Sequence, residues 1–141
     1  MEVKTKVTFS FAKLARNLPR ILEKTASRCA RSSAKGARKN IDKGVVPPLK
    51  QSTLNIRHNR GVTGTKPLYE TGNLYRSIKA QGDKLTMNSY GILHHKGFTT
   101  RANSVVPKKK VSARPFIKPD EQEILTVFDA FKKDIRKNFR K

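Results

Sequence analysis

The sequence predicts an α+β fold in which a small antiparallel sheet packs with a long N-terminal helix and a C-terminal amphipathic helix. Apolar residues recur at helical spacing from Phe11 to about Ile41, and again over residues 124–139. Between these stretches, two short segments flank the turn-forming run Gln81-Gly82-Asp83, as in a hairpin. A length of 141 residues is that of one domain, so we expect a single domain over residues 1–141.

The N-terminal third is predicted to hold a strand followed by a long helix. Alternation with polar residues indicates a half-buried strand at Val3, Thr5, Val7 and Phe9. The apolar face of the following helix is formed by Phe11, Leu14, Leu18, Ile21, Leu22, Thr25 and Cys29. Pro19 has no backbone N–H, so it either begins a new helix or bends a continuous one. The helical pattern ends at Gly44.

The middle of the chain is predicted to combine loops with short elements. Prolines and glycines over about residues 45–67 indicate a long loop, and a second long loop, basic and rich in small residues, is expected at about 97–113. Thr71-Gly72-Asn73 indicates a turn or a short helical start, and residues 77–80 and 84–88 form the predicted hairpin. Residues 89–96 predict a short helix that ends at Gly97.

The C-terminal helix has the most complete set of signals. Pro119 and Asp120 begin it, and Asp120 with Glu123 fits the capping-box pattern, with acidic residues at the positive end of the helix dipole. One apolar stripe is formed by Ile124, Val127, Phe128, Phe131, Ile135 and Phe139. We expect this stripe to pack against the helix around residues 18–41, where Phe128→Ala would cost about 3–5 kcal/mol if the ring is fully buried.

Composition excludes several classes of protein. The chain has 32 Lys and Arg against 10 Asp and Glu, a formal net charge of +22. No apolar run approaches the roughly 18 residues of a membrane span, and the N-terminus lacks a signal peptide's apolar stretch, so we expect no membrane contact. One cysteine and three histidines cannot supply a disulfide framework or a zinc finger. We therefore expect no metal and no cofactor.

Catalytic constellations are also missing from the sequence. Between residues 3 and 119 the only acids are Glu23, Asp42, Glu70 and Asp83, each isolated among bases. No nucleophile motif or phosphate-binding glycine loop is found. The pair His94-His95 points in two directions on a helix or strand, which favours a structural or interface role over a catalytic one. We expect a protein that is not an enzyme.

The basic runs fit either of two partners. Lys and Arg bind phosphates without reading sequence, and they bind acidic proteins equally well. No helix-turn-helix or other nucleic-acid-binding motif is found, and the tyrosines do not form a base-stacking platform. Composition leaves DNA and acidic protein partners open, and the candidate contacts for either are Arg101, Lys108, Lys109 and Lys110.

Four segments resemble, in order, one known family. Residues 44–54 contain Pro48-Leu49 and Ser52-Thr53; residues 68–78 read L-x-x-T-G-x-L-x-x-S-I; residues 90–97 resemble Y-A-x-x-H-x-x-G; and Ser112 to Ile117 resemble P-A-R-P-F-L. Together they are similar to the virion-morphogenesis or tail-completion proteins of tailed bacteriophages, which lie in the head–tail neck. The chain departs from that family at Val45-Val46, where Trp is usual, and at Ser112, where Pro is usual.

The resemblance implies a structural virion protein that forms a ring in the neck, completes the tail and joins it to the head around the DNA channel. It implies a homo-oligomer of six copies, or alternatively twelve, assembled in the host cytoplasm. The neighbours would be a neck connector or stopper and a tail-tube or sheath protein, with non-specific DNA contact in the channel. The alternatives are a basic nucleic-acid-binding protein, or a stopper or tail-tube subunit of the same assembly.

The motif residues receive structural or interface roles. The set is Thr71, Gly72, Leu74, Ser77, Tyr90, His94, Gly97, Arg114, Pro115 and Phe116. Thr71-Gly72 offers a cap and a permissive φ, while Leu74, Ile78 and Phe116 are expected to hold the fold. Arg114 and the histidine pair are the expected contacts between subunits, and the two long loops are expected to reach a neighbour.

Overall fold

The computed structural model describes residues 11–104 and 107–139, and it has an α+β fold. Its helices are α1 (Phe11–Lys43), α2 (Gln51–Asn59), α3 (Asn73–Ser77), α4 (Ser89–Lys96) and α5 (Glu121–Phe139). Its strands are β1 (Lys79–Gln81), β2 (Lys84–Thr86), β3 (Phe98–Thr99) and β4 (Lys110–Val111). The strand expected over residues 3–9 lies outside the described residues.

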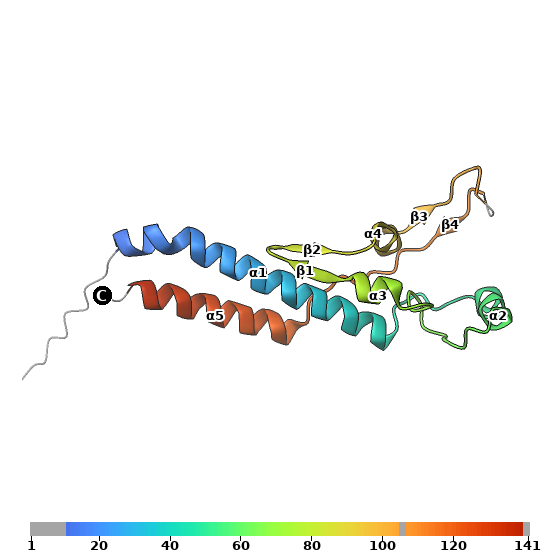
Figure 1. The fold of residues 1–141 in the computed structure, drawn as a ribbon, viewed down its shortest axis with the longest axis horizontal. Coiled ribbons are helices and arrows are strands. Elements are labelled where there is room, and N and C mark those ends of the chain that lie inside the picture. Colours follow the sequence, from blue (N-terminus) through green and yellow to red (C-terminus); the bar gives the residue numbers. More distant parts are fainter. Residues whose placement is uncertain (1–10, 105–106, 140–141) are drawn as a thin grey trace, which may run out of the picture.

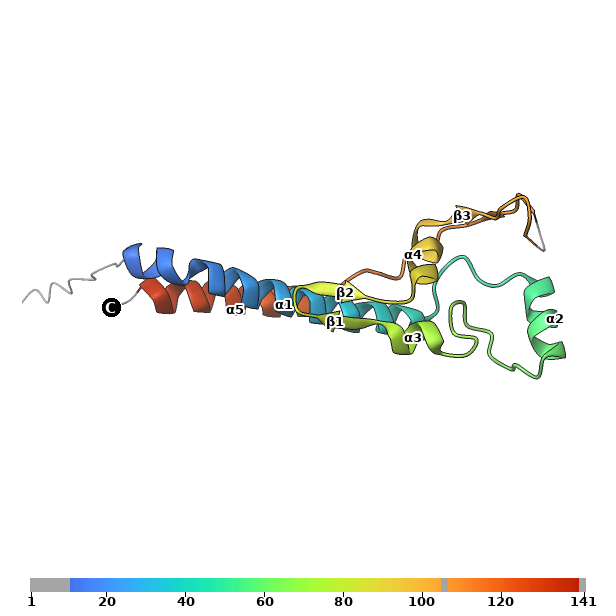
Figure 2. The same cartoon turned by 45° about the horizontal axis from the view of Figure 1, so that its top comes forward.

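The molecule is elongated (Figure 1). Helices α1 and α5 run side by side, and the β1–β2 hairpin lies along α1. Helix α2 and the β3–β4 hairpin lie beyond the C-terminal end of α1 (Figure 2). They are separate from each other, and we call them the two arms. Both sheets have two antiparallel strands, with Ala80 opposite Leu85 in one and Phe98 opposite Val111 in the other. The expected small antiparallel sheet with two long helices is confirmed.

Helix α1 is continuous over 33 residues and contains Pro19, so no second helix begins at that proline. It ends where predicted, because Gly44 adopts a φ of 88° and donates its N–H to Ile41 O at 3.1 Å. A left-handed residue after the last turn closes a helix end, and glycine takes that conformation without steric cost.

The core is small and lies beside the C-terminal half of α1. It consists of Ala34, Ala37, Ile41, Val45, Leu74, Ile78 and Phe116. The small α1 residues allow other backbones to approach closely: a Cβ on Gly36 would lie 2.5 Å from Lys118 O. Side chains of the same helix bind those backbones, since Arg38 donates to Ile78 O and Asn40 donates to Phe116 O and Lys118 O. The core thus joins α1 to three later segments of the chain.

Helix α5 packs on α1, as expected, and polar and charged contacts join the two helices. Asn17 donates to Asn138 at 2.8 Å, and Arg28 donates to Asp134 at 2.9 Å. Further ion pairs join Lys24 to Asp134, Lys35 to Glu123 and Lys39 to Asp120. Three acidic residues of the C-terminal segment therefore pair with four basic residues of α1.

The apolar stripe of α5 is not a buried core, and the condition of a fully buried Phe128 ring is not met. No described residue of α5 is buried, and Phe128 and Ile124 keep 53% and 46% of their surface exposed. Helix α5 has α1 as its one neighbouring helix among the described elements, so one side of the stripe stays open.

The N-terminus of α5 is only partly a capping box. The Asp120 carboxylate accepts the Gln122 N–H at 3.0 Å, as a capping residue does. The hydrogen bond from Lys39, followed by the Gln122 backbone, lowers the pKa of Asp120 below its ordinary 3.8. Glu123 pairs with Lys35 instead of returning to the backbone of residue 120, because α1 offers a cation.

Two expected loops contain regular structure. Residues 51–59 form α2, and residues 98–111 form the β3–β4 hairpin, in which Thr100 N donates to Lys109 O at 2.9 Å. The other short elements are confirmed: α3 begins after Gly72, which has a φ of 71°, and α4 ends before Gly97. The Tyr75 hydroxyl donates to Asp42 at 3.0 Å, which ties α3 to α1.

Candidate functional site

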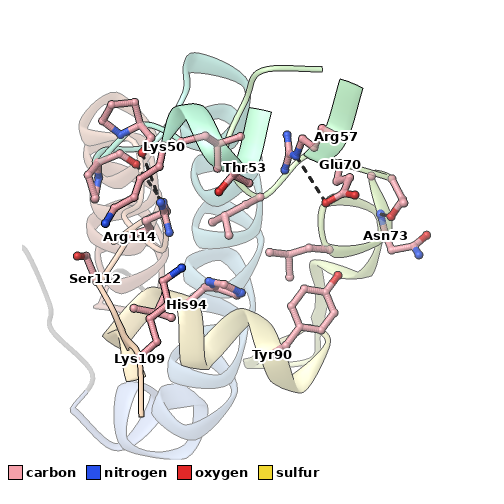
Figure 3. Close-up of a pocket in the computed structure, with 18 of the residues that line it drawn as sticks. Lys50, Thr53, Arg57, Glu70, Asn73, Tyr90, His94, Lys109, Ser112 and Arg114 are labelled. Carbon is pink, nitrogen blue, oxygen red and sulfur yellow. Dashed lines mark hydrogen bonds and ion pairs between the residues drawn. The ribbon is translucent and has the colours of Figure 1, made fainter. Parts of the chain in front are cut away.

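A cleft of about 700 Å³ lies between the two arms and the helices beneath them (Figure 3). It is lined by four separate segments, within residues 47–57, 68–74, 90–94 and 109–114. Each of these segments overlaps one of the four stretches that resemble the phage family. Stretches that are far apart in the sequence thus meet around one hollow.

Most of the residues singled out from the sequence lie at this cleft. Those that line it are Thr71, Gly72, Leu74, Tyr90, His94, Lys109, Lys110 and Arg114. The others lie elsewhere: Phe116 is fully buried in the core, and Ser77 joins two backbones, donating to Leu74 O and accepting from Asn88 N. Arg101, Lys108 and Pro115 are exposed outside the cleft.

Gly97 has a purely structural role beside the cleft. Its φ is 76°, and a Cβ there would lie 2.8 Å from Ala113 N and 3.0 Å from Val111 O. A side chain would therefore push the strand β4 segment away from α4. The glycine keeps one wall of the cleft in place.

Arg114 links three lining segments. Its Nε donates to Pro47 O at 3.0 Å and its guanidinium also reaches Pro48 O at 3.5 Å, while its backbone N–H donates to His94 O at 2.8 Å. The side chain is half-buried. Its partners are neutral carbonyl groups and not a carboxylate, so no negative charge compensates its positive charge. Arg114 holds the 47–48 loop against α4 and keeps a positive charge at the cleft.

His94 stands between two aromatic rings. Its ring meets those of Phe98 and Tyr90 edge to face, with centroids 5.3 and 6.3 Å away. Burial, and then the charge of Arg114, lowers the pKa of His94 below its ordinary 6.5. Its buried Nδ1 has no hydrogen-bond partner among the described residues. The ring is therefore neutral at pH 7.

His95 has a role inside the fold. Its Nδ1 accepts the backbone N–H groups of Phe116 and Ile117 at 3.2 and 3.3 Å, and its ring packs on Phe116 at 5.5 Å. The two neighbouring histidines therefore do different things: His95 fixes the segment before α5, and His94 faces the cleft.

Arg57 and Lys50 are among the lining residues that the sequence-based prediction missed. Only 5% of the surface of Arg57 is exposed, and its guanidinium donates to Gly64 O at 2.9 Å and Lys66 O at 3.0 Å. Its Nε also lies 3.5 Å from the Glu70 carboxylate. Arg57 holds the loop after α2 in place. Because residues 45–67 are predicted to be a loop, nothing in the sequence indicates that this arginine is buried.

The charge at the cleft is strongly positive. Five cationic side chains line it, with Glu70 as the acid among its lining residues. In Figure 3, Lys50 and Arg114 lie on one side and the Arg57–Glu70 pair lies opposite, with Tyr90 below that pair and His94 between the two sides. Lys50, Lys109, Lys110 and Arg114 form no ion pair within the described part of the chain. The cleft therefore favours an anionic occupant.

A second hollow, the helical groove, lies between α1 and α5. It has a volume of about 390 Å³ and is lined by Leu22, Thr25, Cys29, Ser32, Ser33, Pro119, Ile124, Val127, Phe128 and Phe131. Its lining is almost entirely apolar at the surface. The open side of the α5 stripe therefore forms a hydrophobic surface along the two helices.

Neither hollow is lined by a cluster of metal-ligating side chains among the described residues. Over residues 11–104 and 107–139, no group of three or more His, Cys, Asp or Glu side chains is placed to hold a metal ion. In the same residues, every helix is too short or too polar to span a bilayer. Comparison with known proteins gives no match, whether to a protein-family model, to a curated protein or to a solved structure.

Proposed function

We propose that this chain is a structural subunit of the head–tail neck of a tailed bacteriophage. In this function, copies form a ring around the DNA channel that completes the tail and joins it to the head. The observation that carries the proposal is the convergence of the four family-like segments around one cleft. Short motifs that matched by chance would have no reason to meet in space.

The distribution of apolar surface supports a ring. A cyclic assembly with head-to-tail contacts needs two different complementary surfaces on each subunit. The helical groove is one such surface, at the α1–α5 part of the molecule. Candidates for the other are exposed apolar side chains outside the groove, on the loop before α2, on α2 and on α4: Val46, Ile56, Ile92 and Leu93. A contiguous apolar surface such as the helical groove is typical of interaction sites.

The test is the assembly state of the purified chain. Multi-angle light scattering and negative-stain microscopy, with and without isolated phage tail tubes, are expected to show closed rings of six copies, or alternatively twelve. Stacking of these rings into long tubes would instead indicate a tail-tube subunit. A chain that stays monomeric or dimeric in both conditions, and whose DNA affinity falls steeply with salt, would be a nucleic-acid-binding protein.

A further inference from the structure

We infer that the cleft binds an extended acidic segment of a neighbouring protein, with apolar side chains between its carboxylates. This inference rests on the proposed function for the identity of the neighbour. The chemistry of the occupant follows from the cleft itself.

The first argument is charge complementarity. Lys50, Lys109, Lys110 and Arg114 lie around the cleft without an ion pair in the described residues. Arg57, in contrast, is compensated by Glu70 and by two backbone carbonyls. Four uncompensated cations around one hollow repel each other, and an occupant with carboxylates removes that repulsion.

The second argument is the apolar part of the lining. Leu49, Leu68 and Val111 face the same space as the cations. A phosphodiester backbone has no apolar groups to place against them, whereas a peptide can alternate carboxylates with apolar side chains. The mixed lining therefore favours a peptide over a nucleic acid.

The third argument is an open strand edge. Four consecutive residues, Lys109 to Ser112, line the cleft around β4. Successive side chains of a strand point to opposite faces, so a run of neighbours lines one hollow where the strand presents its edge. In the described sheet β4 pairs with β3 alone, which leaves its other edge unpaired. An extended segment can pair with such an edge through its backbone.

The fourth argument separates protein from DNA as the main partner. A ring about 40 Å thick surrounds roughly 24 phosphates, at one per about 1.7 Å of duplex. Six copies of a chain with charge +22 carry +132. DNA in the channel therefore neutralises a minor part of the charge, and the rest is available for acidic neighbours.

The test measures binding of three probes to the full chain by fluorescence anisotropy at fixed ionic strength. The probes are a labelled peptide of alternating glutamate and leucine, the same peptide with glutamine for glutamate, and a single-stranded oligonucleotide of equal negative charge. The acidic peptide is expected to bind most tightly. The double variant Lys50→Glu, Lys109→Glu is expected to weaken its binding about tenfold.

The matched control is the double variant Lys84→Glu, Lys133→Glu. It makes the same change in net charge at two exposed lysines outside the cleft. Circular dichroism of both variants establishes that they are folded. The control is expected to weaken peptide binding about twofold, through the general field of the protein.

Failure of the acidic peptide to bind would overturn the inference, and so would three other results. The first is an equal loss of peptide affinity in both double variants. The second is a glutamine peptide that binds as tightly as the acidic one. The third is an oligonucleotide that binds more tightly than either peptide and whose affinity falls in the Lys50→Glu, Lys109→Glu variant. The last would assign the cleft to phosphates. Because peptide binding and assembly have separate readouts, ring formation with no peptide binding contradicts only this inference. Peptide binding by a chain that never assembles contradicts only the proposed ring.

Discussion

Individual residues decide how closely the segments of this molecule approach each other. Gly36 allows residues 118–120 to lie directly on α1, and Gly97 allows residues 111–113 to lie on the end of α4. Arg114, Arg57 and His95 then hold the loops by bonding backbone groups. The cleft is therefore built by glycines that make room and by polar side chains that bind carbonyls and amides.

Replacing Gly36 with alanine is expected to destabilise the fold by about 1–3 kcal/mol, as overpacking does. Helix propensity alone would make the alanine variant more stable by about 1 kcal/mol. A loss of stability would therefore show that the backbone of residues 118–120 lies against Gly36. The added Cβ would meet Lys118 O at 2.5 Å and Pro119 Cα at 2.9 Å, both backbone atoms. Urea unfolding measures the change, and Glu23→Ala at an exposed site of α1 is the control. A stabilised Gly36→Ala protein would contradict this packing.

His94 is expected to make stability depend on pH below about 6.5. Burial and Arg114 lower its pKa in the folded chain, so the unfolded chain takes up a proton first as the pH falls. Stability is therefore lost from the unfolded pKa down to the folded one. Asp120 and Asp134 have pKa values below their ordinary 3.8 and titrate at lower pH.

The measurement is urea unfolding at about pH 7.5 and pH 5.5, on either side of the ordinary histidine pKa. His94→Phe keeps a ring between Tyr90 and Phe98, and it is expected to lose less stability than the wild type over this interval. Equal losses in the two proteins would show that His94 is not responsible.

At the scale of elements, α1 organises the molecule by presenting two different surfaces. One consists of small and apolar residues, which receive the β1–β2 hairpin and the segment before α5. The other is basic and receives the acids of α5. The packing of α5 on α1 leaves part of the α5 stripe uncovered, which is why Phe128 is exposed whereas Phe116 of the core is buried.

Two identical substitutions are expected to separate these environments. Phe116 is fully buried, so Phe116→Ala is expected to cost about 3–5 kcal/mol. Phe128 keeps 53% of its surface exposed, so Phe128→Ala is expected to cost about 1 kcal/mol in a single copy. Urea unfolding at low protein concentration measures both. Similar costs at the two positions would mean that α5 is buried more deeply than its packing on α1 allows.

At the scale of the whole molecule, an elongated shape separates two kinds of surface. The helical groove runs along α1 and α5, and the basic cleft lies at the end that carries the arms (Figure 1). We propose that the groove serves contacts between copies and the cleft serves contacts with a different protein. This division gives each surface its own variant and its own measurement.

Phe128→Asp is expected to prevent assembly and to leave the single copy folded. It places a charge in the helical groove, where burial against a neighbouring copy would remove the carboxylate from water. Gln122→Asp is the control, since it adds the same charge at an exposed site of α5 outside the groove. Light scattering measures the mass of each variant. Rings formed by Phe128→Asp would show that the groove is not the contact between copies.

The sequence alone determined the long and locally specified features of this protein. Helix α1 with its end at Gly44, helix α5 with Asp120 as its cap, the β1–β2 hairpin and α4 before Gly97 all follow from periodicity, capping and turn residues. These signals involve residues that are close in sequence, so the elements can be predicted from the sequence alone. The four family-like segments could also be identified from the sequence, and most of the motif residues selected in them line the cleft.

Only the tertiary structure decided what those elements do together. Helix α2 sits in a segment read as a loop, and Arg57 holds the chain that follows it through carbonyls seven and nine residues away. Burial along the α5 stripe depends on how many neighbours cover it, which periodicity does not report. The different roles of His94 and His95, and the meeting of four segments at one cleft, depend on contacts between residues far apart in the sequence. Such contacts are set by the shape and close packing of the whole fold, so they could be seen only there.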